Sequence, residues 1–144
     1  MGQVIEKVLE FKKKYPGTIA WRLKKNASVI EKHLNPGEEV LYVFAGQRQL
    51  SRYDIFHTAV VAITNKRIIV GRKRVLFGYF LDTITPDMFN DFNIKVGMLF
   101  GRVVIDTIKE VLMISLLSKK SMPEVETALS ETMIMLKKEY SKEE

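Results

Sequence analysis

Three short segments, VLYVFA (40–45), TAVVAIT (58–64) and RIIVG (67–71), are rich in the β-branched and aromatic residues that favour strands. VLYVFA, AVVAI (59–63) and LMISLL (112–117) are apolar at successive positions instead of at alternate positions. Successive side chains of a strand point to opposite faces, so a strand that is apolar throughout must be buried on both faces. One face can line the core of the domain. The sequence therefore predicts a sheet that needs a second layer over its other face.

A two-residue turn at Asn65-Lys66 is predicted between the second and third segments. Asn tolerates the left-handed backbone at the first corner of a tight hairpin, which would place Thr64 opposite Arg67. The alternation of side chains then puts Arg67 and Arg72 on opposite faces. A phosphate-binding strip would need its cations on one face, so this stretch favours a structural hairpin.

Further strands are predicted over residues 79–84, 91–96, 102–107 and 110–117, the last two joined by a tight turn at Ile108-Lys109. Gaps of turn length separate most of the seven strands, which indicates an antiparallel meander and not parallel β-α-β units. The length of 144 residues suits one domain of mainly β structure with additional helices, in the α+β class.

Helical segments are expected before the sheet, over residues 3–15, 18–24 and 26–34. In the first, Val4, Val8 and Phe11 repeat at spacings of four and three and form one apolar face. Asn26 is a candidate cap for the third. We expect the apolar face to cover the outer face of the sheet, and self-association through the sheet is the alternative.

A last helix is predicted over residues 122–140. Ser121 and Glu124 have the spacing of a capping box, and Pro123 lies in the first turn. The predicted organisation is an N-terminal helical extension (1–34) that packs on the sheet, followed by a domain (35–141) that includes this helix.

The residue types and motifs of the chain argue against a catalytic or metal-binding site. The chain contains no cysteine, which excludes disulfides, thiolate catalysis and cysteine-ligated zinc. His33 and His57 have no second ligand at helical spacing, and no P-loop, dinucleotide or nucleophile-elbow motif is present. We therefore predict a protein that is not an enzyme and has no metal or other cofactor, and the sequence identifies no small-molecule substrate. Without a signal-peptide core or an apolar stretch of about 20 residues, we expect a cytoplasmic location.

Four segments, in this order, resemble the bacterial pleckstrin-homology-like domains, most closely the YokE-like branch: HLNPGEEVLYVFAG (33–46), AITNKRIIVGRK (62–73), GYFLDTI (78–84) and GMLFGRVVIDT (97–107). The resemblance covers roughly residues 33–138. It implies a strongly bent antiparallel sheet of seven strands, closed at one end by the C-terminal helix, and a binding platform whose ligand differs among members. Eukaryotic relatives hold phosphoinositides with a Lys and a basic-x-Arg group in the first hairpin. In this chain the corresponding loop has only Arg48 and Arg52. The resemblance therefore gives no reason to expect that this chain binds a phosphoinositide headgroup.

The charge of the chain is unevenly distributed. Residues 1–80 carry 15 Lys and Arg against 6 Asp and Glu, whereas residues 81–144 carry 8 against 11. A basic half points to an anionic partner, although the same bias is common among solvated domains. The candidate binding residues are Arg48, Arg52, Lys66, Arg72, Lys73 and Arg74, around the 46–57 and 72–75 loops.

These observations predict a non-catalytic binding or scaffolding module for a protein partner, a second copy or an anionic lipid surface. Loop cations alone would hold it only weakly on a membrane, because each contributes about 1 kcal/mol. The alternative is a nucleic-acid-binding protein with the cations on phosphates and Tyr53, Phe56 or Phe77 stacked on bases. The dispersion of the cations along the chain argues against nucleic acid as the partner.

Deletion of residues 1–33 is expected to give an insoluble or aggregating protein, because it would expose the outer apolar face of the sheet. Size-exclusion chromatography and thermal unfolding of the truncated protein measure this. A truncated form that stays monomeric and as heat-stable as the parent would refute the placement of the helices on the sheet.

Overall fold

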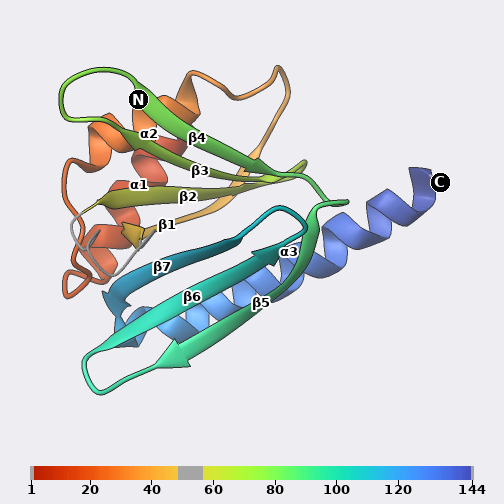
Figure 1. The fold of residues 1–144 in the computed structure, drawn as a ribbon. Coiled ribbons are helices and arrows are strands. Elements are labelled where there is room, and N and C mark those ends of the chain that lie inside the picture. The colour runs from red at the N-terminus through yellow and green to blue at the C-terminus, as the bar shows by residue number, and fades with distance from the viewer. Residues whose placement is uncertain (1, 49–56, 144) are drawn as a thin grey trace.

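The computed structural model describes residues 2–48 and 57–143 and contains one curled antiparallel sheet (Figure 1). The strand order is β4-β3-β2-β1-β7-β6-β5, so β4 and β5 form the two edges. The strands are β1 (Val40–Arg48), β2 (Thr58–Thr64), β3 (Ile68–Lys73), β4 (Tyr79–Ile84), β5 (Phe89–Val96), β6 (Phe100–Thr107) and β7 (Val111–Ser118). The predicted fold class and all seven predicted strands are confirmed. Both predicted tight turns are present, with Thr64 N–H donating to Arg67 O at 2.9 Å and Thr107 N–H donating to Glu110 O at 3.0 Å.

The sheet separates two apolar clusters. On its inner face, residues such as Phe44, Val61 and Ile68 pack with side chains of β5–β7 and of the C-terminal helix α3 (Met122–Glu143). On the outer face, the alternate residues of the same strands, such as Val43 and Val60, pack under the N-terminal helices. Figure 1 shows these helices on one side of the sheet and α3 behind β5 and β6. Both faces of β2 and of most of β1 are therefore buried, as the unbroken apolar runs 40–45 and 59–63 predict, and both faces of the first four residues of β3 are buried as well. The same prediction for residues 112–117 was wrong, because alternate residues of β7 stay partly exposed.

The N-terminal layer consists of α1 (Gln3–Lys14) and α2 (Leu23–Glu31). The helix predicted over residues 18–24 was wrong, because the first part of this segment pairs with the end of β7. Ile19 N–H donates to Leu116 O at 2.9 Å, and Ser118 N–H donates to Thr18 Oγ1 at 2.8 Å. Arg22 then adopts a left-handed backbone conformation immediately before α2.

Asn26 is not a helix cap, which corrects the sequence prediction. It is buried within α2, where its amide donates to Trp21 O at 3.2 Å and its Oδ1 accepts from Lys73 N–H at 2.8 Å. A polar side chain in a helix interior disfavours the helix unless it gains such partners. Asn26 thus fixes the end of β3 against α2.

The C-terminal helix begins where the sequence predicts, but the capping box is replaced by other contacts. Ser121 Oγ donates to Ser118 O at 2.7 Å, and Glu124 accepts from Tyr42 Oη at 2.8 Å and pairs with Lys14 Nζ at 2.5 Å. Glu124 therefore links α3 to β1 and α1. In the part of the chain described, no helix is both long enough and apolar enough to span a membrane.

Substitution of Gly71 tests the close packing of α2 on β3. A Cβ atom at this position would lie 2.6 Å from Ile30 Cγ1. We expect Gly71→Ala to lower the free energy of unfolding by about 1–3 kcal/mol, the range for overpacked sites. Urea unfolding measures the change. Gly17→Ala is the control, since a Cβ there meets its nearest atom at an ordinary 3.6 Å; equal unfolding midpoints for the two variants would contradict the packing.

Candidate functional site

The two sequence motifs most typical of the fold meet in one buried hydrogen-bonded network. Glu38 of NPGEEV accepts from Arg67 Nε and Nη2, both at 3.0 Å, and from Thr64 Oγ1 at 2.6 Å. The backbone N–H of Asn35 also donates to Glu38, at 3.0 Å, and Arg67 donates to His33 O at 2.8 Å. This network joins the turn before β1 to the β2–β3 hairpin. The hydrogen-bond donors and acceptors of the network pair with one another, which indicates a structural role for both motifs.

The ionisation of Glu38 follows from these contacts. Burial raises the pKa of its carboxyl, but the hydrogen bonds from Arg67, Asn35 and Thr64 outweigh burial and hold the pKa below the ordinary value of 4.5. Glu38 is therefore a carboxylate at neutral pH and balances the charge of Arg67.

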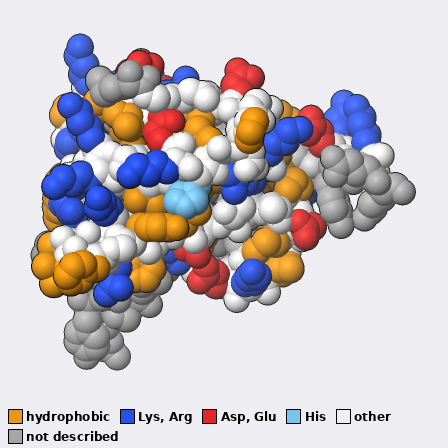
Figure 2. Space-filling view, turned by 90° about the horizontal axis from the view of Figure 1, so that it is seen from above, with side chains coloured by type: hydrophobic (Ala, Val, Ile, Leu, Met, Phe, Trp, Pro, Cys, Tyr) orange, Lys and Arg blue, Asp and Glu red, His pale blue; other side chains and the backbone are white. Residues whose placement is uncertain are grey.

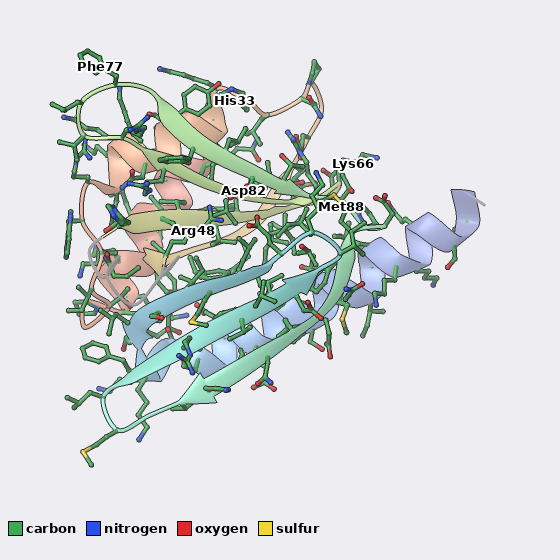
Figure 3. All side chains as sticks on the ribbon, in the orientation of Figure 1. His33, Arg48, Lys66, Phe77, Asp82 and Met88 are labelled. Carbon is green, nitrogen blue, oxygen red and sulfur yellow. The ribbon has the colours of Figure 1, made fainter. Side chains whose placement is uncertain are left out.

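Arg48, the first candidate cation, lies inside the fold. Its side chain is 9% exposed and pairs with Asp82 of β4 and with Glu110 of the β6–β7 turn, the latter at 3.7 Å. Figure 3 labels Arg48 and Asp82 on neighbouring parts of the sheet. Arg48 holds the two halves of the sheet together and does not face a surface ligand.

The other predicted cations divide between two ends of the sheet. Lys66 is exposed at the tip of the β2–β3 hairpin, at the end away from Phe77 (Figure 3). Arg52 lies outside the described residues, as do Tyr53, Phe56 and most of the predicted 46–57 loop. Arg72 and Lys73 end β3, and Arg74 begins the β3–β4 loop. The structure therefore gathers Arg72, Lys73 and Arg74, and separates them from Lys66.

Three consecutive apolar side chains project from the β3–β4 loop. Val75, Leu76 and Phe77 are 77%, 83% and 82% exposed, and Gly78 closes the loop with a φ of +78°. Figure 3 shows Phe77 directed outward from the loop. We call residues 73–77 the loop surface. Of these three apolar residues, only Phe77 was predicted from the sequence to contact a partner. The run RKRVLFG contains the signal for all three: an apolar triplet between three cations and a turn glycine.

Aromatic side chains border the loop surface. Arg72 and Arg74 lie over the ring of Phe80, with Cζ 4.6 and 5.4 Å from its centroid. Trp21 and Tyr79 are also exposed large side chains, and the segment with Trp21 is tied to Lys73 through Asn26. In Figure 2, Lys and Arg side chains gather with apolar ones toward the end of the molecule where Figure 1 places the β3–β4 loop.

The described segments that form the loop surface and its border carry positive charge. Between residues 57 and 81, and between residues 11 and 30, the sequence has no Asp or Glu. The cations of the loop surface therefore have no carboxylate in their own segments to neutralise them. Val75, Leu76 and Phe77 thus form an apolar tip, and Arg72, Lys73 and Arg74 form the cationic base beneath it.

A groove of about 640 Å³ lies between β1 and α3. Its walls include Leu41, Ala128 and Met135, together with Tyr42 and Glu124. Burial, together with the neighbouring Glu124 carboxylate, raises the pKa of the Tyr42 hydroxyl far above its ordinary value. Tyr42 therefore stays protonated and acts as a hydrogen-bond donor to Glu124. Within residues 2–48 and 57–143, no group of three or more His, Asp or Glu side chains is arranged to hold a metal ion.

Comparison with known proteins gives one family and one structure. The family model described as a bacterial PH domain matches residues 34–131. The chain is also similar to the crystal structure of a pleckstrin homology domain from Shewanella amazonensis SB2B, with a TM-score of 0.49 and 12% sequence identity over 78% of this chain and 89% of that chain. None of the curated proteins compared matches this chain. The assignment to the YokE-like branch stays a prediction.

Glu38→Gln tests the structural role of the motif network. It leaves Arg67 buried without its counter-ion, and we expect a loss of about 3 kcal/mol in unfolding free energy at pH 7. Because the folded-state pKa of Glu38 is lowered, its stabilisation is complete above pH 4.5 and is lost as the pH falls through the folded pKa.

The difference between parent and Glu38→Gln should therefore shrink below pH 4.5 in urea unfolding measured across pH. Exposed Glu39 supplies the matched control, Glu39→Gln, which should change stability by about 0.5 kcal/mol or less. A difference that stays constant from pH 7 to pH 3 would contradict the ionic role of Glu38.

Proposed function

This chain belongs to the bacterial PH domain family, and from that premise we propose that it is a non-catalytic binding module that docks through its loop surface onto an anionic membrane. The proposal places it in the cytoplasm, at the inner face of the membrane. The observation that carries the proposal is the exposure of Val75, Leu76 and Phe77 on a base of cations.

The physical argument combines two contributions. Transfer of a Val, Leu or Phe side chain from water to an apolar phase is favourable by about 1.5–3 kcal/mol when burial is complete. Each Lys or Arg beside an anionic surface adds about 1 kcal/mol. Cations alone would give weak, reversible attachment. An apolar tip that enters the interface while Lys73 and Arg74 contact the headgroups gives a stronger and better oriented attachment.

The same features disfavour the other partners. Nucleic acid offers phosphates to the cations and stacking partners to Phe77, but the aliphatic Val75 and Leu76 have no corresponding site on it. A symmetric contact between two copies of this loop would bury the tip, but it would place Lys73 and Arg74 opposite the same cations of the second copy. An anionic membrane is the partner that satisfies both the apolar and the charged residues.

Leu76→Ser should weaken binding to vesicles of phosphatidylserine and phosphatidylcholine by about tenfold or more, since a loss of 1.4 kcal/mol corresponds to a factor of ten. Co-sedimentation measures the bound fraction. Ile108→Ser is the matched control, because Ile108 is also an exposed apolar side chain at a turn but lies outside the loop surface. Equal binding by the two variants would refute the role of the tip.

Lys73→Ala/Arg74→Ala should reduce binding to the same vesicles and lower its dependence on salt. The exposed pair Lys137 and Lys138, near the far end of α3, provides the control Lys137→Ala/Lys138→Ala. If the parent protein does not co-sediment with vesicles but binds generic DNA or RNA with a steep salt dependence, the membrane proposal is wrong and the nucleic-acid alternative is supported.

A further inference from the structure

A small cavity of about 200 Å³ lies directly beside the loop surface, between α2 and the start of β4. Its polar lining comes from Ser28 of α2, from Lys32 and His33 just after this helix, and from Lys73 and Tyr79 at the two sides of the β3–β4 loop. We call it the α2–β4 pocket. Four of these five side chains bear cationic or hydroxyl groups, and the fifth is an imidazole. Ser28 Oγ already donates to Lys25 O at 2.7 Å, so the donors that the pocket offers to an anion are the ammonium groups of Lys32 and Lys73 and the Tyr79 hydroxyl.

His33 is held in one orientation. Its Nδ1 lies 2.6 Å from Val29 O, and since a carbonyl only accepts, Nδ1 carries a hydrogen. The other nitrogen, Nε2, lies 3.1 Å from the Tyr79 hydroxyl, and the two rings are 5.0 Å apart. A ligand that contacts the Tyr79 hydroxyl in the pocket therefore changes the surroundings of the His33 ring.

Among the described residues, none that lines the α2–β4 pocket is Asp or Glu. The nearest carboxylate along α2, Glu31, is directed to the other side, where its Oε1 accepts from Ile5 N–H at 3.1 Å. Lys32 and Lys73 therefore approach one cavity from two elements without a carboxylate among its lining residues. Two ammonium groups match the charge of a phosphate monoester, which carries close to two negative charges at neutral pH.

From these contacts we infer that the α2–β4 pocket binds a phosphate monoester, with Lys32 and Lys73 as charge partners and the Tyr79 hydroxyl, beside His33, as a hydrogen-bonding group. Charge-assisted hydrogen bonds of this kind are the short and strong class. Ser28 and Lys32 precede residue 34, where the family match begins, so the pocket depends on a helix that the match does not include. The inference rests on the proposed function in one respect: the loop surface would bring the pocket to a headgroup bearing such a phosphate.

Two measurements separate the sources of the phosphate. In the first, inorganic phosphate is titrated into the full chain while the imidazole proton signals are followed by NMR, with His57→Gln used to assign His33. The signal of His33 should shift in a saturable manner, and Lys32→Ala should weaken this binding by about tenfold, the loss of one charge-assisted contact. Lys24→Ala changes an exposed lysine of α2 that does not line the pocket, and it should leave phosphate binding unchanged.

In the second measurement, vesicles of equal surface charge are made with phosphatidic acid, whose phosphate is a monoester, or with phosphatidylglycerol, whose phosphate is a diester. The parent should prefer phosphatidic acid, and Lys32→Ala should lose the preference while it still binds both. Leu76→Ser should weaken binding to both.

The outcomes distinguish the two proposals. A phosphate-dependent shift of His33 without vesicle binding supports the pocket, assigns it a free phosphate monoester and refutes membrane docking. Vesicle binding without a lipid preference and without a His33 shift refutes the pocket and leaves the loop surface standing. Absence of every signal refutes both.

Discussion

The fold depends on the burial of both faces of the β1–β3 part of the sheet. Val60 and Val61 are adjacent in β2, and both are fully buried, one under the N-terminal helices and the other in the core with α3. Such a strand is stable only between two apolar layers. The helices α1 and α2 are therefore part of the folded unit, and Gly71 permits α2 to approach β3 closely. The same contact sets the candidate sites, because it places Lys32 and His33 of the α2 end beside the β3–β4 loop.

The charged residues separate into structural and exposed sets. Glu38 with Arg67, and Arg48 with Asp82, serve the interior of the fold. Against this background, the exposure of Val75, Leu76 and Phe77 is informative, since single exposed apolar residues are ordinary but a contiguous group at a loop tip marks a contact surface. The loop surface and the α2–β4 pocket share Lys73. Together they would give one module an apolar anchor and a polar recognition site for the same interface.

The sequence predicted local features well and long-range ones poorly. The strands and both tight turns followed from unbroken β-branched runs and from Asn65, which are local signals. The false helix over residues 18–24 arose because its partner, Leu116, is distant in the chain. The ion pair of Arg48 with Asp82 likewise depends on how the sheet curls, so no local sequence pattern indicates that Arg48 is buried. The apolar triplet in the β3–β4 loop was visible in the sequence, but only Phe77 was predicted to contact a partner, and that as a stacking surface for bases.

The central claim, that the β3–β4 loop enters a membrane interface, is tested most directly by the depth of residue 76. The chain has no cysteine, so Leu76→Cys and Ile108→Cys each provide a single site for a nitroxide spin label. On anionic vesicles, the label at position 76 should become protected from a water-soluble relaxation agent and more accessible to oxygen, whereas the label at position 108 should not change. A label at position 76 that stays as accessible to the water-soluble agent on vesicles as in solution would contradict the account.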